Sequence, residues 1–347
     1  MDERVGVGII GCGAVARQRL KGPYPELHDL AEVVATCDPL RERAETLATD
    51  SRQLGADCQV YTDLGALLAD PRVQAVDICT PHPAHAEPTI AAAEAGKHVL
   101  VEKPIATTLA DGRRMVAAAR AAGLVLCVNE QLRVQEPVIR AREMIAAGEV
   151  GTVAVARAHR IGYLGGVWMA SGWRHDASKA GGGMLLDQGP HYFNMLRTLV
   201  GPVAGEVTHV AARATTVRED WRAEDTAVVI LQFESGLLAE ALYCWATRTP
   251  ELGAVGSVYG ARGSLDVMPA DAGLVLHRPD LPGGRRVIIE ADGYDSGVRV
   301  SVEDFLRAVR GERAASATGE EGLRDLAVIV ACYHSLKSGQ FERVETV

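Results

Sequence analysis

The sequence predicts an α/β protein of two domains, with a doubly wound parallel sheet first and then an α/β domain with a mostly antiparallel sheet. Up to about residue 128, short apolar segments alternate with segments of helical length, as in a parallel sheet that helices cover on both faces. Beyond residue 129, longer alternating segments follow one another between turn signals, which is typical of antiparallel strands. We therefore expect domains at residues 1–128 and 129–347.

Five apolar segments of the first domain have strand length. They are residues 4–10, 33–37, 73–80, 98–102 and 124–128. Helical patterns separate them, from Gly13 to about residue 20 and at residues 40–54, 84–95 and 109–122. Gly96 and Gly123 follow the last two helical patterns, and glycine is the usual residue just beyond a helix end.

The second domain combines four helical patterns with a run of strands. The helices are expected at residues 135–147, 182–199, 300–309 and 319–338. The strands are expected at residues 153–161, 207–217, 226–234, 237–245 and 253–259, with shorter ones up to residue 290. Ser235-Gly236 and Pro282-Gly283-Gly284 are typical of hairpin turns. The alternation predicts a sheet with one face left to solvent or to a partner.

Composition excludes several classes of partner. The chain has 347 residues, 48% of them hydrophobic, and a net charge of −9 without a basic run, so nucleic acid and anionic membranes are not expected as partners. Its seven cysteines form no C-x-x-C pair and lie mostly in apolar segments, as reduced thiols do. Acidic Asp2-Glu3 stands where a signal peptide would be basic. We expect a soluble, cytoplasmic protein.

A nucleotide-binding motif follows the first strand. Gly11-Cys12-Gly13-Ala14-Val15-Ala16 fits G-x-G-x-x-A at a strand–turn–helix junction, where backbone N–H groups approach a pyrophosphate. Asp38 ends the second strand, at the distance expected for an acid that binds the adenosine ribose. Its simpler interpretation is a helix N-cap. The acid favours NAD over NADP, although the nearby Arg41 and Arg43 could pair with a 2′-phosphate.

Two further clusters carry residues suited to acid–base chemistry. Glu102-Lys103-Pro104 ends the strand 98–102 at the carboxyl edge of the predicted sheet, where doubly wound folds bind ligands. Asp187 and His191 are four residues apart, so on a helix they share one face. A carboxylate beside an imidazole forms an acid/base pair near neutral pH. Three glycines at residues 181–183 leave room for a close approach to the backbone. An ordinary solvated lysine and a surface polar pair are the simpler interpretations.

Taken together, these motifs resemble the Gfo/Idh/MocA (glucose–fructose oxidoreductase, inositol dehydrogenase) family over essentially the whole chain. The matching elements are the G-x-G-x-x-A motif, Thr80-Pro81 with His85, Glu102-Lys103-Pro104, Asn129, Trp173-Arg174 and the G-G-G-x-L-x-D-x-G-x-H run at 181–191. The resemblance implies a Rossmann domain and a C-terminal α/β domain whose large open sheet forms a homodimer or homotetramer. It also implies hydride transfer between NAD(P) and a secondary alcohol or ketone of a sugar, polyol or inositol-like substrate.

The resemblance also implies roles for individual residues. Lys103, Asp187 and His191 would be catalytic: His191 takes the hydroxyl proton, Lys103 stabilises the developing alkoxide, and Asp187 orients the substrate or the imidazole. The cofactor would contact Gly11, Gly13, Ala14, Val15, Asp38, Thr80, Pro81, His85, Glu102, Lys103 and Asn129. The substrate would contact Lys103, Tyr163, Trp173, Arg174, Asp187, His191 and Asn194, and His159 is a further candidate.

The chain departs from the family in one segment, and two other functions are compatible with its motifs. Many family members carry an aromatic or arginine set after the Asn129 position, where this chain has Glu130-Gln131-Leu132-Arg133. No Cys/His cluster has the spacing of zinc ligands, so no metal is expected. An NAD-dependent glycosidase, which holds its cofactor tightly and oxidises the ring only transiently, would need the same residues. A non-catalytic NAD-binding sensor is the other alternative, although the intact Lys103, Asp187 and His191 count against it.

Overall fold

The computed structural model describes residues 4–169, 172–249, 253–268, 270–290 and 294–347, and its chain divides into two compact units. The first unit comprises the chain up to Gln131 together with Asp295–Leu323, and the second comprises Leu132–Tyr294 and Arg324–Val347. The segment 295–323 therefore belongs to the first unit, although the sequence led us to place it in a continuous second domain. Val302, Phe305 and Leu306 are fully buried in the core of the first unit, which explains the return of the chain.

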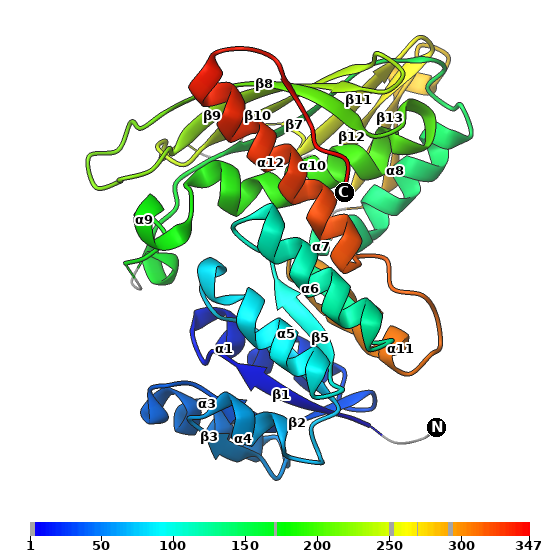
Figure 1. The fold of residues 1–347 in the computed structure, drawn as a ribbon. Helices are drawn as coiled ribbons and strands as arrows, with labels where there is room; N and C mark the ends of the chain where they lie inside the picture. Colours follow the sequence, from blue (N-terminus) through cyan, green and yellow to red (C-terminus); the bar gives the residue numbers. More distant parts are fainter. Residues whose placement is uncertain (1–3, 170–171, 250–252, 269, 291–293) are drawn as a thin grey trace. The chain divides into compact units, whose positions relative to one another are not determined.

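A parallel sheet of six strands forms the centre of the first unit (Figure 1). Its order is β3-β2-β1-β4-β5-β6, so the chain runs outward from β1 in both directions, and the reversal point lies between β1 and β4. In doubly wound sheets ligands bind beyond the carboxyl ends of the strands at such a point. The strands are β1 (Val5–Ile10), β2 (Ala31–Cys37), β3 (Gln59–Tyr61), β4 (Ala75–Ile78), β5 (His98–Glu102) and β6 (Leu126–Asn129).

The helices of the first unit confirm the predicted alternation and add short elements. They are α1 (Ala14–Lys21), α2 (Pro23–Glu26), α3 (Arg41–Gln53), α4 (Leu64–Leu68), α5 (Ala86–Glu94), α6 (Leu109–Ala121) and α11 (Tyr294–Val309). The prediction missed β3 and α4, because elements of three and five residues are too short to show a period. It also began α11 six residues late, since Gly297 lowers the local helix propensity there.

A sheet of nine strands forms the second unit, in the order β14-β13-β12-β11-β7-β10-β9-β8-β15. Every neighbouring pair is antiparallel except β7 and β10, so the prediction of a mostly antiparallel sheet is confirmed. The strands are β7 (Val153–Ile161), β8 (Val207–Thr215), β9 (Thr226–Phe233), β10 (Leu238–Cys244), β11 (Gly256–Gly260), β12 (Gly263–Val267), β13 (Leu274–His277), β14 (Arg285–Ile289) and β15 (Glu342–Arg343).

The long helix α10 (Met184–Ala204) packs on one face of this sheet, against β7, β9 and β10. It continues five residues past its predicted end, because Val200 and Ala204 are still buried and Gly205, with φ of +77°, ends it. The other helices of the unit are α7 (Gln131–Val134), α8 (Glu136–Ala146), α9 (Ala177–Ala180) and α12 (Gly319–Ser338).

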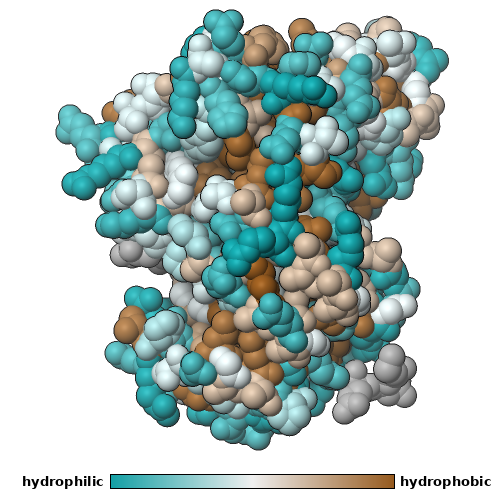
Figure 2. Space-filling model, in the orientation of Figure 1, coloured by the Kyte–Doolittle hydropathy of each residue, from teal (hydrophilic) through white to brown (hydrophobic). Residues whose placement is uncertain are grey.

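Figure 2 shows hydrophilic side chains over much of the visible face, with hydrophobic residues in areas between them. Among the described residues, no helix combines the length and the apolar character that crossing a membrane would need. The seven cysteines are all free, and six of them are buried.

Candidate active site

The glycine-rich loop between β1 and α1 leaves backbone accessible. Gly11 has φ of +86°, and a Cβ there would lie 2.9 Å from the Thr80 backbone nitrogen, so only glycine fits. A Cβ at Gly13 would meet no atom within 4 Å. Gly13 is the N-cap of α1 and has no side chain to accept from the first N–H groups, which begin at Ala14 and Val15. Such a helix N-terminus suits a phosphate group, and the loop fits a dinucleotide.

Asp38 is held against this loop. It follows β2 and is 7% exposed, its Oδ2 accepts from the Cys12 N–H at 3.0 Å, and its Oδ1 accepts from the Leu40 N–H at 2.9 Å. Each carboxylate oxygen keeps a further lone pair for a ribose hydroxyl. The N-cap of α3 is Leu40, so the simpler interpretation of Asp38 as a helix N-cap is wrong. Asp38 closes the turn before the helix instead.

His85 joins the loops that follow β4 and β5. Its ring is fully buried, with Nδ1 at 2.8 Å from the Pro104 carbonyl oxygen and Nε2 at 3.0 Å from the Thr80 carbonyl oxygen. Burial lowers the pKa of His85, although both carbonyl groups favour its protonated form. The contact of His85 with a nicotinamide-side ribose stays a prediction. In this structure its ring holds together the two loops that carry Thr80, Pro81 and Lys103.

Glu102 lies at the carboxyl end of β5, and its carboxylate accepts hydrogen bonds from several residues. Its Oε1 accepts from Asn129 Nδ2 at 2.9 Å, and its Oε2 accepts from the Lys103 backbone N–H at 3.2 Å. Arg19, on α1, forms an ion pair with the same Oε1. The next peptide bond, Lys103–Pro104, is cis. The structure thus brings together Glu102, Lys103 and Asn129, as the motifs predict for one edge of the sheet.

In the second unit, Asp187 and His191 lie one turn apart on α10, with 5% and 4% of their surfaces exposed. Arg174 Nε donates to Asp187 Oδ2 at 3.0 Å, so the carboxylate is neutralised by an ion pair. The Arg174 guanidinium lies 4.5 Å from the ring centroid of Trp173 and 5.5 Å from that of Trp168. The predicted pair is therefore accompanied by an arginine that two indole rings hold in place.

The glycines ahead of α10 make room for protein side chains. A Cβ at Gly182 would lie 2.2 Å from Tyr333 Oη, and one at Gly183 would lie 2.4 Å from the Glu224 carbonyl oxygen. Glu224 Oε1 accepts from the N–H groups of Gly183 and Leu185 and from Tyr333 Oη. Glu224 therefore caps the helix that carries Asp187 and His191, and this close approach accounts for Gly182 and Gly183 without a ligand.

The remaining predicted substrate residues are already engaged within the second unit. Tyr163 is 42% exposed, and the guanidinium groups of Arg218 and Arg248 lie 4.3 and 4.1 Å from its ring centroid. His159 pairs with Glu240 on the neighbouring strand at 2.9 Å. Their contacts with substrate stay predictions.

Asn194 is also engaged, one turn beyond His191. Its Nδ2 donates to Asp325 at 2.6 Å, and its Oδ1 accepts from Thr198 at 3.3 Å. Its amide is 1% exposed and belongs to a buried network between α10 and α12. Its contact with a substrate hydroxyl stays a prediction that this network does not support.

Three residues that organise the site were missed from the sequence: Arg19, Glu224 and Tyr333. Only Arg19 left a signal, because it lies three residues after Ala16 on the buried side of α1, a position where a core residue is expected. Glu224 and Tyr333 are 41 and 150 residues from the Gly183 N–H that they approach. Among the described residues, no three His, Cys, Asp or Glu side chains gather as a metal site would require.

Comparisons with known proteins agree with this architecture. Residues 5–130 match the family model described as an oxidoreductase family with an NAD-binding Rossmann fold, and residues 142–346 match the model of its C-terminal alpha/beta domain. The chain is similar to 1,5-anhydro-D-fructose reductase of Ensifer adhaerens, with 34% identity over 98% of each chain. It is also similar to D-apiose dehydrogenase of Paraburkholderia graminis, with 30% identity over 96% of this chain and 88% of that one.

A solved structure shows the same likeness. The WlbA dehydrogenase of Bordetella pertussis, in complex with NADH and UDP-GlcNAcA, is 25% identical and has a TM-score of 0.81. The match covers 99% of this chain and 100% of that chain.

Proposed function

The chain belongs to the Gfo/Idh/MocA family of NAD-binding oxidoreductases, and from this premise we propose the roles of its residues and the class of its substrate. It is an NAD(P)-dependent sugar or polyol dehydrogenase. The reaction moves hydride between nicotinamide and a secondary alcohol or ketone of a sugar, polyol or inositol-like ring. The observation that carries the proposal is the presence of Lys103 after β5 and of Asp187 with His191 on α10.

When bound, NAD supplies the hydride acceptor or donor, and the chain supplies positions and charges. In the oxidation direction His191 takes the hydroxyl proton. Lys103 places a positive charge beside the developing alkoxide, which stabilises the transition state more than the ground state. Asp187, held by Arg174, orients the substrate or the imidazole.

The cofactor preferred is NAD rather than NADP. The Asp38 carboxylate lies next to the glycine-rich loop, where it would accept from ribose hydroxyls and repel a 2′-phosphate. Arg41, which could have paired with that phosphate, forms an ion pair with Glu45 at 2.8 Å. The pyrophosphate would lie against Gly11, Gly13, Ala14 and Val15. Thr80, Pro81, His85, Glu102, Lys103 and Asn129 would line the nicotinamide side.

The deciding experiment has two steps. First, the purified protein is denatured and the supernatant is assayed for NAD(H) and NADP(H). Second, the native protein is mixed with 1,5-anhydro-D-fructose and NADH, and with D-apiose or myo-inositol and NAD⁺, while nicotinamide absorbance is followed. Turnover with any of these would support the proposal. No absorbance change across a wide sugar and polyol panel, with a stoichiometric nucleotide that stays bound, would favour the glycosidase alternative.

We also propose that different parts of the chain bind the cofactor and the substrate. Residues 1–128, completed by the returning segment 295–323, would bind the dinucleotide, and the rest of the chain from residue 129 on would bind the substrate and the partner subunit. The face of the nine-stranded sheet opposite α10 exposes four neighbouring apolar side chains, Val155, Val228, Ile230 and Leu238, each between 40% and 47%. This exposure supports a homodimer or homotetramer through the sheet. Light scattering should show the oligomer in the wild type and a smaller species in Val228→Asp.

A cytoplasmic location is part of the same proposal. All seven cysteines are free thiols in the structure, and burial raises the pKa of Cys12 to about 12 and that of Cys58 to about 11, which keeps both protonated. Such cysteines suit a reducing compartment. Fractionation of cells that produce the protein would test this.

A further inference from the structure

Arg19 is a fully buried arginine beneath the carboxyl ends of β4 and β5. It is 2% exposed, although its helix α1 has polar residues before and after it. Its Nε lies 3.3 Å from Asp77 Oδ2, and its Nη2 forms an ion pair with Glu102 Oε1. Asp77 is completely buried and accepts from Tyr24 Oη at 2.9 Å. A single guanidinium therefore joins two carboxylates on neighbouring strands.

Arg19 keeps its positive charge although it is buried. Burial by itself would lower the pKa of Arg19, but the carboxylates of Glu102 and Asp77 outweigh burial and raise its pKa above the usual value. Burial raises the pKa of Asp77, and Arg19 opposes that rise. Arg19 thus stays charged and forms ion pairs with both carboxylates.

The Nη2 group of Arg19, which pairs with Glu102, makes no contact that Asp77 depends on. Asp77 already accepts a hydrogen bond from Tyr24 Oη, and Arg19 Nε lies within ion-pair distance of the same oxygen. The second arm instead helps to orient Glu102, whose other oxygen accepts from the Lys103 backbone N–H at 3.2 Å. Asn129 Nδ2 approaches the same Glu102 Oε1 from β6 at 2.9 Å. The chain of contacts leads from a buried helix position to the main chain of Lys103.

We propose that Arg19 is a positioning residue: it holds the Glu102 carboxylate and, through it, the main chain from which the Lys103 side chain reaches the substrate. This inference rests on the proposed role of Lys103. The guanidinium is suited to the task because its planar fork can donate to two carboxylates at once, which a lysine ammonium does with less defined geometry.

The test compares Arg19→Met, Arg19→Lys and the double variant Arg19→Met/Asp77→Asn with two controls. The double variant removes one buried negative charge together with the positive one, so it should destabilise the fold less than Arg19→Met and keeps the test readable if that variant does not fold. Asp77→Asn is the control among the residues that contact Arg19, because it keeps the ion pair between Arg19 and Glu102. Arg72→Met is the control away from these residues, because it removes an arginine that pairs with Asp70 and Asp57.

Three measurements separate positioning from a structural role. Amide hydrogen exchange of the peptide that contains Lys103 is followed in the nucleotide-free protein, NADH affinity is titrated, and kcat and KM are measured per nucleotide-binding site. For both variants that lack a cation at position 19, we expect faster exchange at Lys103 and a fall of about 30-fold in kcat with a nearly unchanged KM, because a misplaced group costs up to about 100-fold. Arg19→Lys should recover part of kcat, and both controls should keep it within about twofold.

Other outcomes would show that Arg19 does not position Lys103. If the variants without a cation at position 19 melt at a lower temperature, but exchange at Lys103 and kcat per site stay within about twofold of the wild type, Arg19 is only structural and the inference is wrong. If the wild type turns over no sugar or polyol, the proposed function fails. Exchange at Lys103 then still decides whether Arg19 holds this segment.

Discussion

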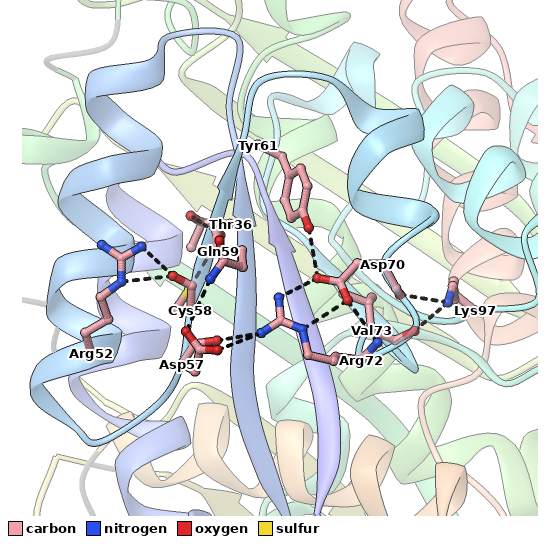
Figure 3. A network of polar contacts seen from close by, with 10 residues as sticks. All are labelled: Thr36, Arg52, Asp57, Cys58, Gln59, Tyr61, Asp70, Arg72, Val73 and Lys97. Carbon is pink, nitrogen blue, oxygen red and sulfur yellow. Dashed lines mark hydrogen bonds and ion pairs between the residues drawn. The ribbon is translucent and has the colours of Figure 1, made fainter.

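Arginines lie at both edges of the six-stranded sheet, and the protein holds them in different ways. Before β4, at the amino edge, Arg72 donates to Asp70 through Nε at 3.1 Å and Nη2 at 2.6 Å, and Tyr61 Oη donates to the same carboxylate at 2.9 Å (Figure 3). The Arg72 side chain is 37% exposed. At the carboxyl edge, Arg19 is buried and shared by two carboxylates.

We interpret the difference in these contacts as follows: the amino edge serves stability, and the carboxyl edge serves ligand binding and catalysis. At the amino edge Arg72 pairs with Asp70, two positions away, and with Asp57, and Lys97 donates to the Val73 carbonyl oxygen at 2.6 Å. The carboxyl edge joins positions 58 to 83 residues apart from Arg19 and leaves backbone at Gly13 open. An edge that must receive a ligand keeps open space beside its backbone, whereas at the amino edge the polar groups bind one another.

Two lysines that flank β5 give the strongest test of this comparison. Lys103→Ala should lower kcat about 100- to 1,000-fold, because the charge beside the developing alkoxide is lost, and the loss of its contact at the nicotinamide side should weaken NADH binding far less. Lys97→Ala is the matched change at the amino edge and should leave kcat within about twofold. Steady-state kinetics and a separate NADH titration check both. Near wild-type turnover in Lys103→Ala would show that its assigned role is wrong.

Alanine substitutions at two glycines test how tightly each edge is packed. A Cβ at Gly6, near the amino edge, would lie 1.9 Å from the Arg72 carbonyl oxygen, so Gly6→Ala should cost about 2–3 kcal/mol of unfolding free energy. Gly13→Ala faces open space in the protein and should keep its stability, but should weaken NADH binding about tenfold, since the methyl group stands where a pyrophosphate would approach. Urea unfolding and NADH titration measure the two effects. Equal destabilisation by both variants would contradict the contrast.

The edges should also respond to acid with opposite signs. Hydrogen bonds from Arg72 lower the pKa of Asp70 to about 2, below the usual value of about 3.9. Asp70 therefore contributes about 1–2 kcal/mol of stability above pH 4, and this contribution is lost as the pH falls towards 2. Asp77, whose pKa burial raises, instead favours folding more in its protonated form. Unfolding of Asp70→Asn should depend less on pH between 4 and 2 than that of the wild type, and identical slopes would count against the ion pair.

The smallest effect concerns cofactor choice at the carboxyl edge. Asp38→Ala should reduce the preference for NAD over NADP about tenfold, because the mutant loses the ribose contact and the repulsion of a 2′-phosphate. The measurement is the ratio of kcat/KM for the two cofactors. Thermal melting serves as the control, since the Asp38 carboxylate also accepts from Cys12 and Leu40. An unchanged ratio would remove Asp38 from the proposed ribose site.

Much of the first unit could be predicted because its signals are local. β5 was placed at His98–Glu102, as the structure has it, since an apolar segment between a helix stop and a proline has few other solutions. The G-x-G-x-x-A motif likewise carries its own geometry, which Gly11 shows with its positive φ. Asp187 and His191 share a helix face because the helical period places residues i and i+4 together.

The sequence by itself therefore determined the two kinds of sheet, the nucleotide motif and the face shared by Asp187 and His191. Only the tertiary structure decided that Arg19 would reach Glu102, that Gly182 and Gly183 would make room for Tyr333 and Glu224, and that 295–323 would return to the first unit. The physical reason is range. Periodicity and turn geometry act between near neighbours, whereas the partners of a buried charge are set by which surfaces pack together across the whole chain.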